Sequence, residues 1–347
     1  MRNFKIGNSE IGRGCKPFII AEMSGNHNQS LERALELVDA AGAAGADAVK
    51  LQTYTADTMT LDIDAGDFVL DGGLWDGRSL YELYQEAHTP WEWHGPIFDR
   101  CREHGMVGFS SAFDLSSVDF LETLDVPAYK IASLELIDTE LIAKAASTGK
   151  PLIMSTGMAT MAEIDEAVRT ARDNGCEDLV LLRCTSAYPA DPADANIASL
   201  PVLANAFGCQ AGLSDHTMGT HLPVAAVALG ATVIEKHFTL RRADGGVDSA
   251  FSLEPEELKL LCEHTRDAAA AIGTPRFGSM PAERISKENR RSLYITQDIK
   301  AGDKLTEDNL KSIRPGHGLP VKYRKNLIGR TVTKDIKRGT PMSWELL

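Results

Sequence analysis

Two short segments place histidines beside charged side chains at the ends of apolar runs. The first is Gly212–Thr217 and the second is Glu235–Phe238. The residues between them, 218–229, are rich in Ala, Val and Leu and predict one helix. In a parallel strand–helix–strand unit the C-terminal ends of both strands meet on one rim. We therefore expect six side chains to share one mouth: Ser214, Asp215, His216, Glu235, Lys236 and His237.

The two histidines are the candidates for metal binding. Two neutral imidazoles that face one cavity can hold a divalent cation. A single histidine is more often a structural residue, but His216 and His237 on adjacent strand ends, with Lys and Asp beside them, favour a site. Imidazole suits several transition metals, so the ligand type does not fix the ion.

Composition limits the class of protein. A chain of 347 residues fits one large domain, or one large and one small domain. The net charge of −13 argues against nucleic-acid binding, and the longest apolar run, residues 224–234, is too short to cross a membrane. With no secretory signal and six cysteines that form no C-x-x-C pair, we expect a cytoplasmic protein.

Charge is distributed unevenly along the chain. From residue 285 onward there are 14 Lys and Arg against 7 Asp and Glu, whereas the rest of the chain has 22 against 42. Opposite charges on two segments favour docking within one chain or between chains, although a solvated surface would give the same balance.

Eight apolar runs of strand length recur along the chain, and helical patterns alternate with them. The runs are Pro17–Met23, Asp47–Gln52, Met106–Ser110, Ala128–Ala132, Pro151–Ser155, Asp178–Cys184, Gln210–Leu213 and Thr232–Glu235. Continuous apolar strands are typical of a parallel sheet that is buried on both faces. The pattern predicts an α/β fold, a (β/α)8 TIM barrel over residues 1–274. A doubly wound open sheet is the main alternative, and the absence of Rossmann and Walker A patterns excludes its nucleotide-binding versions.

The remaining residues have a different pattern. Residues 275–284 contain Gly and Pro and few large apolar residues, which predicts a linker. Residues 285–347 predict a small, mostly β domain, because Asp298–Gly302 (DIKAG) is repeated as Asp335–Gly339 (DIKRG).

Barrel enzymes carry their active sites at the C-terminal strand ends. Three lysines and an arginine with many hydroxyls at these ends fit a site for a small, multiply charged anion. The strand-end residues are Glu22, Asn26, His27, Lys50, Gln52, Ser111, Lys130, Ser133, Ser155, Arg183 and Ser186, besides the six named first.

Several of these motifs together resemble the sialic acid synthase family. They are Ala21-Glu22 with Asn26-His27, Lys50-Leu51-Gln52, Tyr129–Ser133, Ser155–Met158, Cys184–Ser186 with Tyr188-Pro189, Ser214–His216 and Glu235–Phe238. Residues 285–347 resemble that family's antifreeze-like (SAF) domain, with Arg314-Pro315-Gly316 as its signature. Gly72–Asp76 and Val247–Leu253 are similar to the pseudaminic acid branch of the family.

The resemblance implies condensation of phosphoenolpyruvate with an open-chain amino sugar, which in this branch is 2,4-diacetamido-2,4,6-trideoxy-L-altrose. It implies Mn²⁺ or Mg²⁺ on His216 and His237, and Glu22 acting on the attacking water. Lys50, Ser111 and Lys130 would hold the carboxylate. Further residues are implied in two sets: Ser133, Ser155, Ser186 and Ser214 for the phosphate, and Asn26, His27, Gln52, Tyr188, Asp215 and Asp248 for the sugar or its support.

The resemblance also implies a homodimer in which Arg314 reaches the partner's barrel and contacts the N-acyl region of the sugar. The aromatic connection 68–84 would lie above the rim, where Trp75 and Tyr81 either cover the apolar part of the sugar or serve as ordinary packing residues. Three alternatives stay open: an N-acetylneuraminic or legionaminic acid synthase, a metal-dependent pyruvate aldolase, and a non-catalytic carbohydrate-binding protein.

Overall fold

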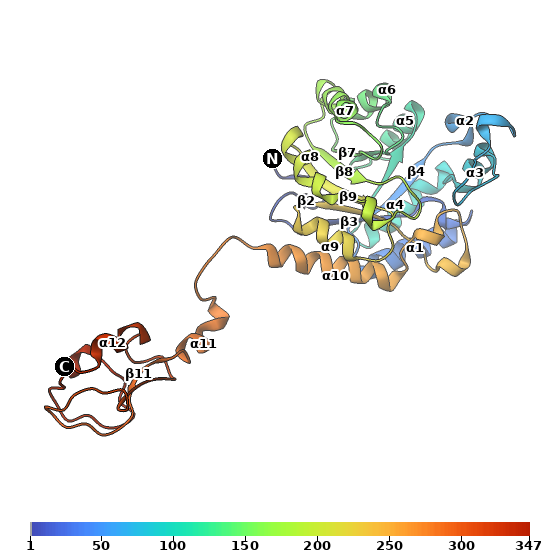
Figure 1. Ribbon diagram of the computed structural model, residues 1–347. Coiled ribbons are helices and arrows are strands. Elements are labelled where there is room, and N and C mark those ends of the chain that lie inside the picture. The colour runs from blue at the N-terminus through green and yellow to red at the C-terminus, as the bar shows by residue number, and fades with distance from the viewer. Residues whose placement is uncertain (1) are drawn as a thin grey trace. The chain divides into compact units, whose positions relative to one another are not determined.

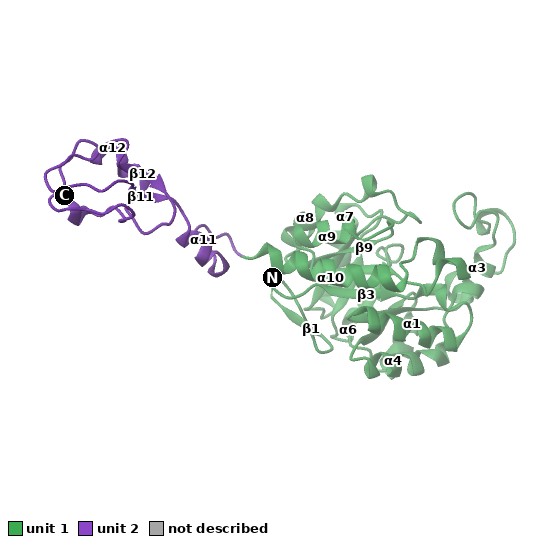
Figure 2. Ribbon diagram, turned by 90° about the horizontal axis from the view of Figure 1, so that it is seen from below, with its two compact units in different colours: residues 1–273 green, residues 274–347 purple. Residues whose placement is uncertain are grey.

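The computed structural model describes residues 2–347, which form two compact units, residues 2–273 and 274–347 (Figure 2). In the first unit a closed barrel of eight parallel strands is surrounded by helices (Figure 1). The barrel strands are β3 (Phe18–Glu22), β4 (Ala48–Thr53), β5 (Val107–Ala112), β6 (Tyr129–Ile131), β7 (Leu152–Ser155), β8 (Leu179–Cys184), β9 (Gln210–Asp215) and β10 (Val233–His237). The predicted TIM barrel is confirmed, and β10 closes it by pairing with β3.

The helices that follow the strands begin at polar caps. Side chains of Ser30, Asp114, Asp138 and Thr160 accept hydrogen bonds from backbone N–H groups of the first turn of their helices. The main helices are α1 (Leu31–Ala44), α4 (His94–Glu103), α5 (Leu115–Thr123), α6 (Thr139–Ser147), α7 (Met161–Asp173), α8 (Leu200–Phe207), α9 (His221–Ala228) and α10 (Pro255–Ile272). The predicted helix over residues 218–229 is therefore shorter than expected, since α9 begins at His221. The described residues contain no helix with the length and apolar character needed to cross a bilayer.

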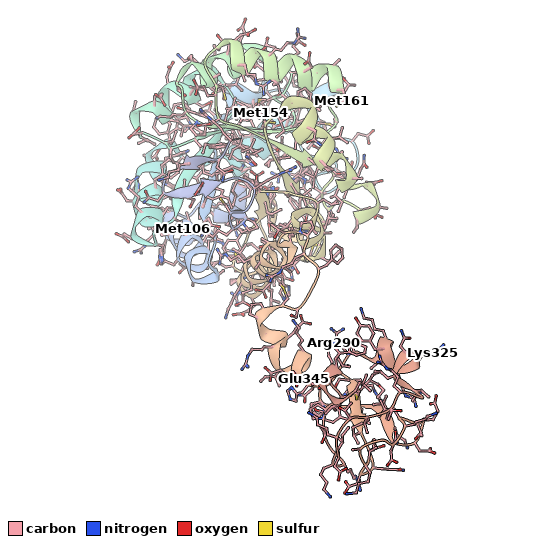
Figure 3. The ribbon with its side chains drawn as sticks, turned by 90° about the vertical axis from the view of Figure 1, so that its left-hand side faces the viewer. Met106, Met154, Met161, Arg290, Lys325 and Glu345 are labelled. Carbon is pink, nitrogen blue, oxygen red and sulfur yellow. The ribbon has the colours of Figure 1, made fainter. Side chains whose placement is uncertain are left out.

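The long connection after β4 has structure of its own. It contains α2 (Ala56–Met59) and α3 (Leu80–Ala87), and between them an antiparallel bridge joins Val69 to Ser79. A ring of buried apolar side chains between strands and helices forms the larger core, in which Met106 and Met154 take part (Figure 3).

An N-terminal hairpin that the sequence analysis did not predict closes the barrel at the N-terminal ends of its strands. Its strands are β1 (Phe4–Ile6) and β2 (Ser9–Ile11), which pair antiparallel. Ile6 and Ile11 are buried in one cluster with residues that point into the barrel from the strands, among them Phe18 and Phe109. The hairpin therefore extends the barrel core at the end opposite to the C-terminal rim.

The second unit is a small domain. It contains α11 (Arg284–Glu288), β11 (Ser292–Ile295), β12 (Leu310–Ile313) and α12 (Arg324–Leu327), and β11 pairs antiparallel with β12. The internal repeat noted in the sequence forms reciprocal ion pairs: Lys300 with Asp335 at 2.6 Å and Lys337 with Asp298 at 2.7 Å. Ile299 and Ile336, one from each repeat, pair across an isolated bridge and share the domain core.

The hairpin makes a stability prediction. The substitution Ile11→Ala leaves a cavity among the packed side chains inside the barrel. It should therefore lower the free energy of unfolding by about 2–5 kcal/mol. Urea unfolding followed by tryptophan fluorescence measures the change. As a control, Ile137→Ala removes a side chain that is 68% exposed and should cost no more than about 0.5 kcal/mol. Equal effects of the two substitutions would show that the hairpin does not belong to the barrel core.

Candidate active site

A cavity of about 300 Å³ opens at the C-terminal ends of the barrel strands. Side chains from all eight strands or from the turns directly after them reach it, because successive residues of a strand alternate between the barrel interior and the helix layer. From the strands and these turns it is lined by Glu22, Ser24, Lys50, Gln52, Ser111, Lys130, Ser133, Ser155, Cys184, Ser214, His216, Glu235 and His237.

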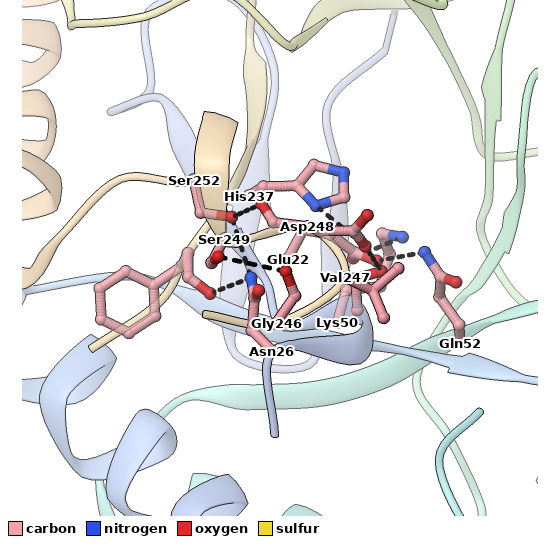
Figure 4. Close-up of polar contacts among 12 residues, drawn as sticks. Glu22, Asn26, Lys50, Gln52, His237, Gly246, Val247, Asp248, Ser249 and Ser252 are labelled. Atoms are coloured by element: carbon pink, nitrogen blue, oxygen red, sulfur yellow. Dashed lines mark hydrogen bonds and ion pairs between the residues drawn. The ribbon is translucent and has the colours of Figure 1, made fainter. Parts of the chain in front are cut away.

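The floor of the cavity is a cluster of four buried charges. The Lys50 ammonium lies 2.5 Å from a Glu22 carboxylate oxygen (Figure 4). It also donates a hydrogen bond to the Ser111 hydroxyl at 2.9 Å. Glu235 lies 3.9 Å from Lys50 and 3.6 Å from Lys130, so it bridges the two ammonium groups. The two positive charges are thus held in place by two carboxylates. An anionic ligand can approach Lys50 and Lys130 from the open side of the cavity.

Asp215 and Lys236 lie elsewhere, and the expectation that all six residues share one mouth is wrong for these two. They sit one residue out of step with Ser214, His216, Glu235 and His237, so the alternation of the strands turns them toward the helix layer. There the Lys236 ammonium pairs with Asp215 at 2.7 Å and also donates to the Thr217 carbonyl. Together they form a buried ion pair behind the site.

Arg183 also differs from the anion-binding role that its strand end indicated. Its guanidinium donates to the backbone carbonyls of Cys184, Ala195 and Asp194, the first at 2.7 Å. All three belong to β8 and the loop after it, so Arg183 holds that loop. The positive charge of the cavity floor therefore comes from two lysines.

Beside the lysines is a niche of hydroxyl groups around Gly157. The backbone N–H of Gly157 donates to the Ser133 hydroxyl at 3.1 Å, and a β-carbon on Gly157 would collide with the hydroxyls of Ser133 and Ser186. Within the described residues the buried hydroxyls of Ser155 and Ser186 have no hydrogen-bond partner. Buried polar groups are normally paired, so these hydroxyls indicate a ligand with several acceptor oxygens, such as a phosphate.

His216 and His237 do face one another across the cavity. Their ring centroids are 5.3 Å apart, and the rings of Tyr188 and Phe251 pack around them. Burial holds the pKa of His237 well below its usual value, and its Nδ1 has no hydrogen-bond partner among residues 2–347. The Nδ1–H of His216 donates to the Thr185 carbonyl at 2.9 Å, which leaves Nε2 as the metal-binding nitrogen of the neutral ring.

These two imidazoles fit a metal that takes its other ligands from substrate and water. Across residues 2–347 no three His, Cys, Asp or Glu side chains are grouped so as to hold an ion by themselves. Burial lowers the pKa of His216, but hydrogen bonding to Cys184 and the charge of that thiol outweigh it and raise the pKa. A bound cation would displace this proton, because only the neutral ring is a ligand.

Two carboxyl groups in the cavity have pKa values near neutrality. Burial raises the pKa of Glu22 to about 7, although the charge of Lys50 opposes this rise. Burial also raises the pKa of Glu135 to about 7. Glu135 lies in the loop after β6, lines the cavity and has one oxygen without a partner in the described part of the chain. The sequence analysis did not identify Glu135 as a site residue. Its position two residues after Ser133, just beyond a strand end, could have indicated it.

The remaining expected residues divide between lining and support. Gln52, Tyr188 and Asp248 line the cavity, and Gln52 donates to Glu22 at 2.9 Å. Asn26 is fully buried and donates to the Phe238 carbonyl and the Ser252 hydroxyl, both at 2.9 Å, so it fixes the loop that carries Asp248 (Figure 4). His27 is buried against the Trp93 ring and bonds to Thr89, which makes it a packing residue of this region.

Arg314 belongs to the second unit. It lies in the loop after β12 and lines a surface hollow whose other cationic residues include Lys287, Arg290 and Arg291. Figure 3 labels Arg290 on this unit.

Known proteins match both units. Residues 290–347 match the SAF domain. Pseudaminic acid synthase of Campylobacter jejuni is 45% identical, over 96% of this chain and 97% of that protein. N,N'-diacetyllegionaminic acid synthase of Legionella pneumophila is 35% identical, over 98% and 99%.

A solved structure matches as well. The crystal structure of N-acetylneuraminic acid (sialic acid) synthetase from Leptospira borgpetersenii, in complex with citrate, has a TM-score of 0.74 and 29% identity, and it covers 82% of this chain and 95% of its own. The NeuB family matches residues 37–276, which include all the lining strands except β3. The chain belongs to the NeuB family.

Proposed function

We propose that this protein condenses phosphoenolpyruvate with 2,4-diacetamido-2,4,6-trideoxy-L-altrose to give pseudaminic acid and phosphate. One observation carries the proposal: a single cavity joins two buried lysines and the hydroxyls of Ser133 and Ser155, of which that of Ser155 is unpaired within the described residues, to a pair of facing imidazoles. The first part suits a small, multiply charged enol phosphate, and the second suits a sugar aldehyde. The 45% identity to a pseudaminic acid synthase over nearly the whole chain supports the choice of sugar.

The reaction joins C3 of phosphoenolpyruvate to the aldehyde carbon of the sugar. Water adds at C2, and the C2–O bond breaks, so that C2 becomes a ketone and phosphate leaves with the bridging oxygen. Of the two protons of the water, one ends on the former aldehyde oxygen, which becomes a hydroxyl group, and the other ends on the phosphate. Lys50, Lys130 and Ser111 hold the carboxylate, and the niche of Ser133, Ser155 and Ser186 holds the phosphate, with Ser214 beside Glu235 at 3.1 Å.

Two carboxyl groups with pKa values near 7 can exchange protons at neutral pH. Glu22 lies at the cavity floor beside Lys50 and accepts the proton of the attacking water. Glu135, in the loop that begins next to Ser133, donates a proton to the departing phosphate. Gln52 keeps the Glu22 carboxylate oriented.

His216 and His237 would hold Mn²⁺ or Mg²⁺, which when bound supplies Lewis-acid polarisation of the aldehyde oxygen. Tyr188 and Phe251 pack around the imidazoles, and Asp248 lies 3.9 Å from Nδ1 of His237. These contacts hold the imidazole rings in their orientation.

We also propose that the protein works in the cytoplasm as a homodimer. All six cysteines are free thiols within residues 2–347. The unequal charge of the two units supports exchange of the small domain between chains, with Arg314 contacting the N-acyl region of the sugar in the partner's barrel.

The experiment that tests the function is product analysis. Incubation with phosphoenolpyruvate and the trideoxy sugar should release phosphate and form a nine-carbon ulosonic acid with the mass of pseudaminic acid. Faster turnover with the legionaminic or sialic acid precursor would favour a legionaminic or N-acetylneuraminic acid synthase, the names that two of the similar proteins carry. Turnover of free pyruvate in place of phosphoenolpyruvate would favour an aldolase, and sugar binding without turnover would favour a binding protein.

The imidazole pair predicts metal dependence. The substitution His237→Ala, or chelation by EDTA, should lower kcat by about 10³-fold or more, because an unpolarised aldehyde is a weak electrophile. Binding of phosphoenolpyruvate, measured by calorimetry, should change little, since its carboxylate and phosphate groups lie at the lysine and hydroxyl end. The control His221→Ala, on the exposed start of α9, should leave kcat unchanged. Full activity in rigorously chelated enzyme would refute the assignment.

The hydroxyl niche predicts a steric effect at Gly157. The substitution Gly157→Ala places a methyl group against the hydroxyls of Ser133 and Ser186 and should raise the KM for phosphoenolpyruvate by about 10- to 100-fold, the loss expected for one or two bonds to a charged group. The KM for the sugar should change less. The matched control is Gly95→Ala, because Gly95 lies in α4 with open space around its position. A larger effect on the sugar than on phosphoenolpyruvate would place the phosphate elsewhere.

A further inference from the structure

One segment of the chain forms a wall of the cavity opposite the charged floor. It is the connection after β4, and the side chains that it contributes include Met59, Leu70, Trp75, Leu80, Leu83 and Tyr84. Five of the six are hydrocarbon, thioether or indole groups. The cavity therefore has an ionic side built by the barrel strands and an apolar side to which this connection contributes most side chains, with Phe113, Leu134 and Val247 added from other loops.

The part of this connection that carries Trp75 is a closed loop, residues 69–79, which we call the Trp75 loop. The backbone N–H of Leu70 donates to the Arg78 carbonyl at 2.9 Å, and that of Gly77 donates back to Leu70 at 2.8 Å. The Asp76 carboxylate accepts from the N–H of Gly72 at 2.6 Å. These bonds hold the loop in one shape.

The loop is attached to the rest of the rim through its indole ring. The Nε1–H of Trp75 donates to the Val247 carbonyl at 3.1 Å. The Trp75 ring centroid lies 5.6 Å from that of Tyr188, which in turn lies 4.4 Å from that of His216. One aromatic ring thus separates the indole from the imidazole pair, and a six-carbon chain that starts at the imidazoles is long enough to reach the loop.

From this placement we infer that the Trp75 loop selects sugars that carry a methyl group at C6 over sugars that carry a hydroxymethyl group there. The inference rests on the proposed function, which places the aldehyde end at the imidazoles. A C6 hydroxyl would lose its water against Leu70 and Trp75 and gain no hydrogen-bond partner from these two side chains. An apolar pocket rejects an added hydroxyl by about 10- to 100-fold in kcat/KM, so the preference should fall in that range.

The test compares the trideoxy sugar with its 6-hydroxy counterpart, which is identical except at C6. The wild-type protein should favour the 6-deoxy sugar by about 10- to 100-fold in kcat/KM, measured by phosphate release. Leu70→Asn supplies a partner for the hydroxyl, and Trp75→Ala opens the wall to water. Each should reduce the preference at least about fivefold while the KM for phosphoenolpyruvate stays within about twofold, which shows that the barrel site is intact.

Two further variants serve as controls. Leu74→Asn changes a side chain in the same loop that is 46% exposed, and it should keep the wild-type preference. Trp75→Phe keeps an apolar ring but removes the donor to Val247, and it should keep most of the preference. An unchanged preference in both Leu70→Asn and Trp75→Ala would overturn the inference.

The outcomes separate this inference from the function on which it rests. Equal kcat/KM values for the two sugars in the wild-type protein would refute selection by the loop and leave the proposed function standing. No phosphate release with either sugar would refute the proposed function and the inference together.

Discussion

The site depends on the ion-pair cluster of Glu22, Lys50, Glu235 and Lys130. All four side chains are almost completely buried, and an uncompensated ammonium at such a depth would cost several kcal/mol. Each lysine instead lies near a carboxylate, which keeps positive charge inside the barrel. The register explains why they meet: Glu22 pairs with Lys50 across β3 and β4, and with His237 across β10. The closed barrel therefore brings acids, lysines and imidazoles from different strands into one layer.

The cavity has two chemically different sides. Most charged and hydroxyl groups come from the strands and the turns directly after them, whereas most of the apolar wall comes from the connection after β4. Under the proposed function, a rigid barrel suits binding of the enol phosphate. A separate connection suits the part that differs among sugars, because its side chains can change without disturbing the strand register.

The sequence was sufficient for the barrel because its strands are continuous apolar runs, and all eight predicted runs end within two residues of the observed strand ends. It was sufficient for His216, His237, Lys50, Lys130 and Glu22, which lie at those ends. The sequence-based prediction failed for residues to which strand alternation was not applied, and for contacts that depend on how loops and termini pack. Strand alternation already separates Asp215 and Lys236 from the cavity. The bonds of Arg183 to its own loop, and the hairpin below the barrel, follow from packing that no local pattern specifies.

Proton uptake on substrate binding tests the role of the cluster most directly. The charge of Lys50 now restrains the pKa of Glu22 at about 7. A substrate carboxylate on Lys50 would share that charge, raise the pKa of Glu22 further and draw a proton from the buffer near pH 7.5. Calorimetry of phosphoenolpyruvate binding in buffers with different ionisation enthalpies measures this uptake. The account predicts greater uptake in the wild-type protein than in Glu22→Gln. Equal proton exchange in both proteins would contradict it.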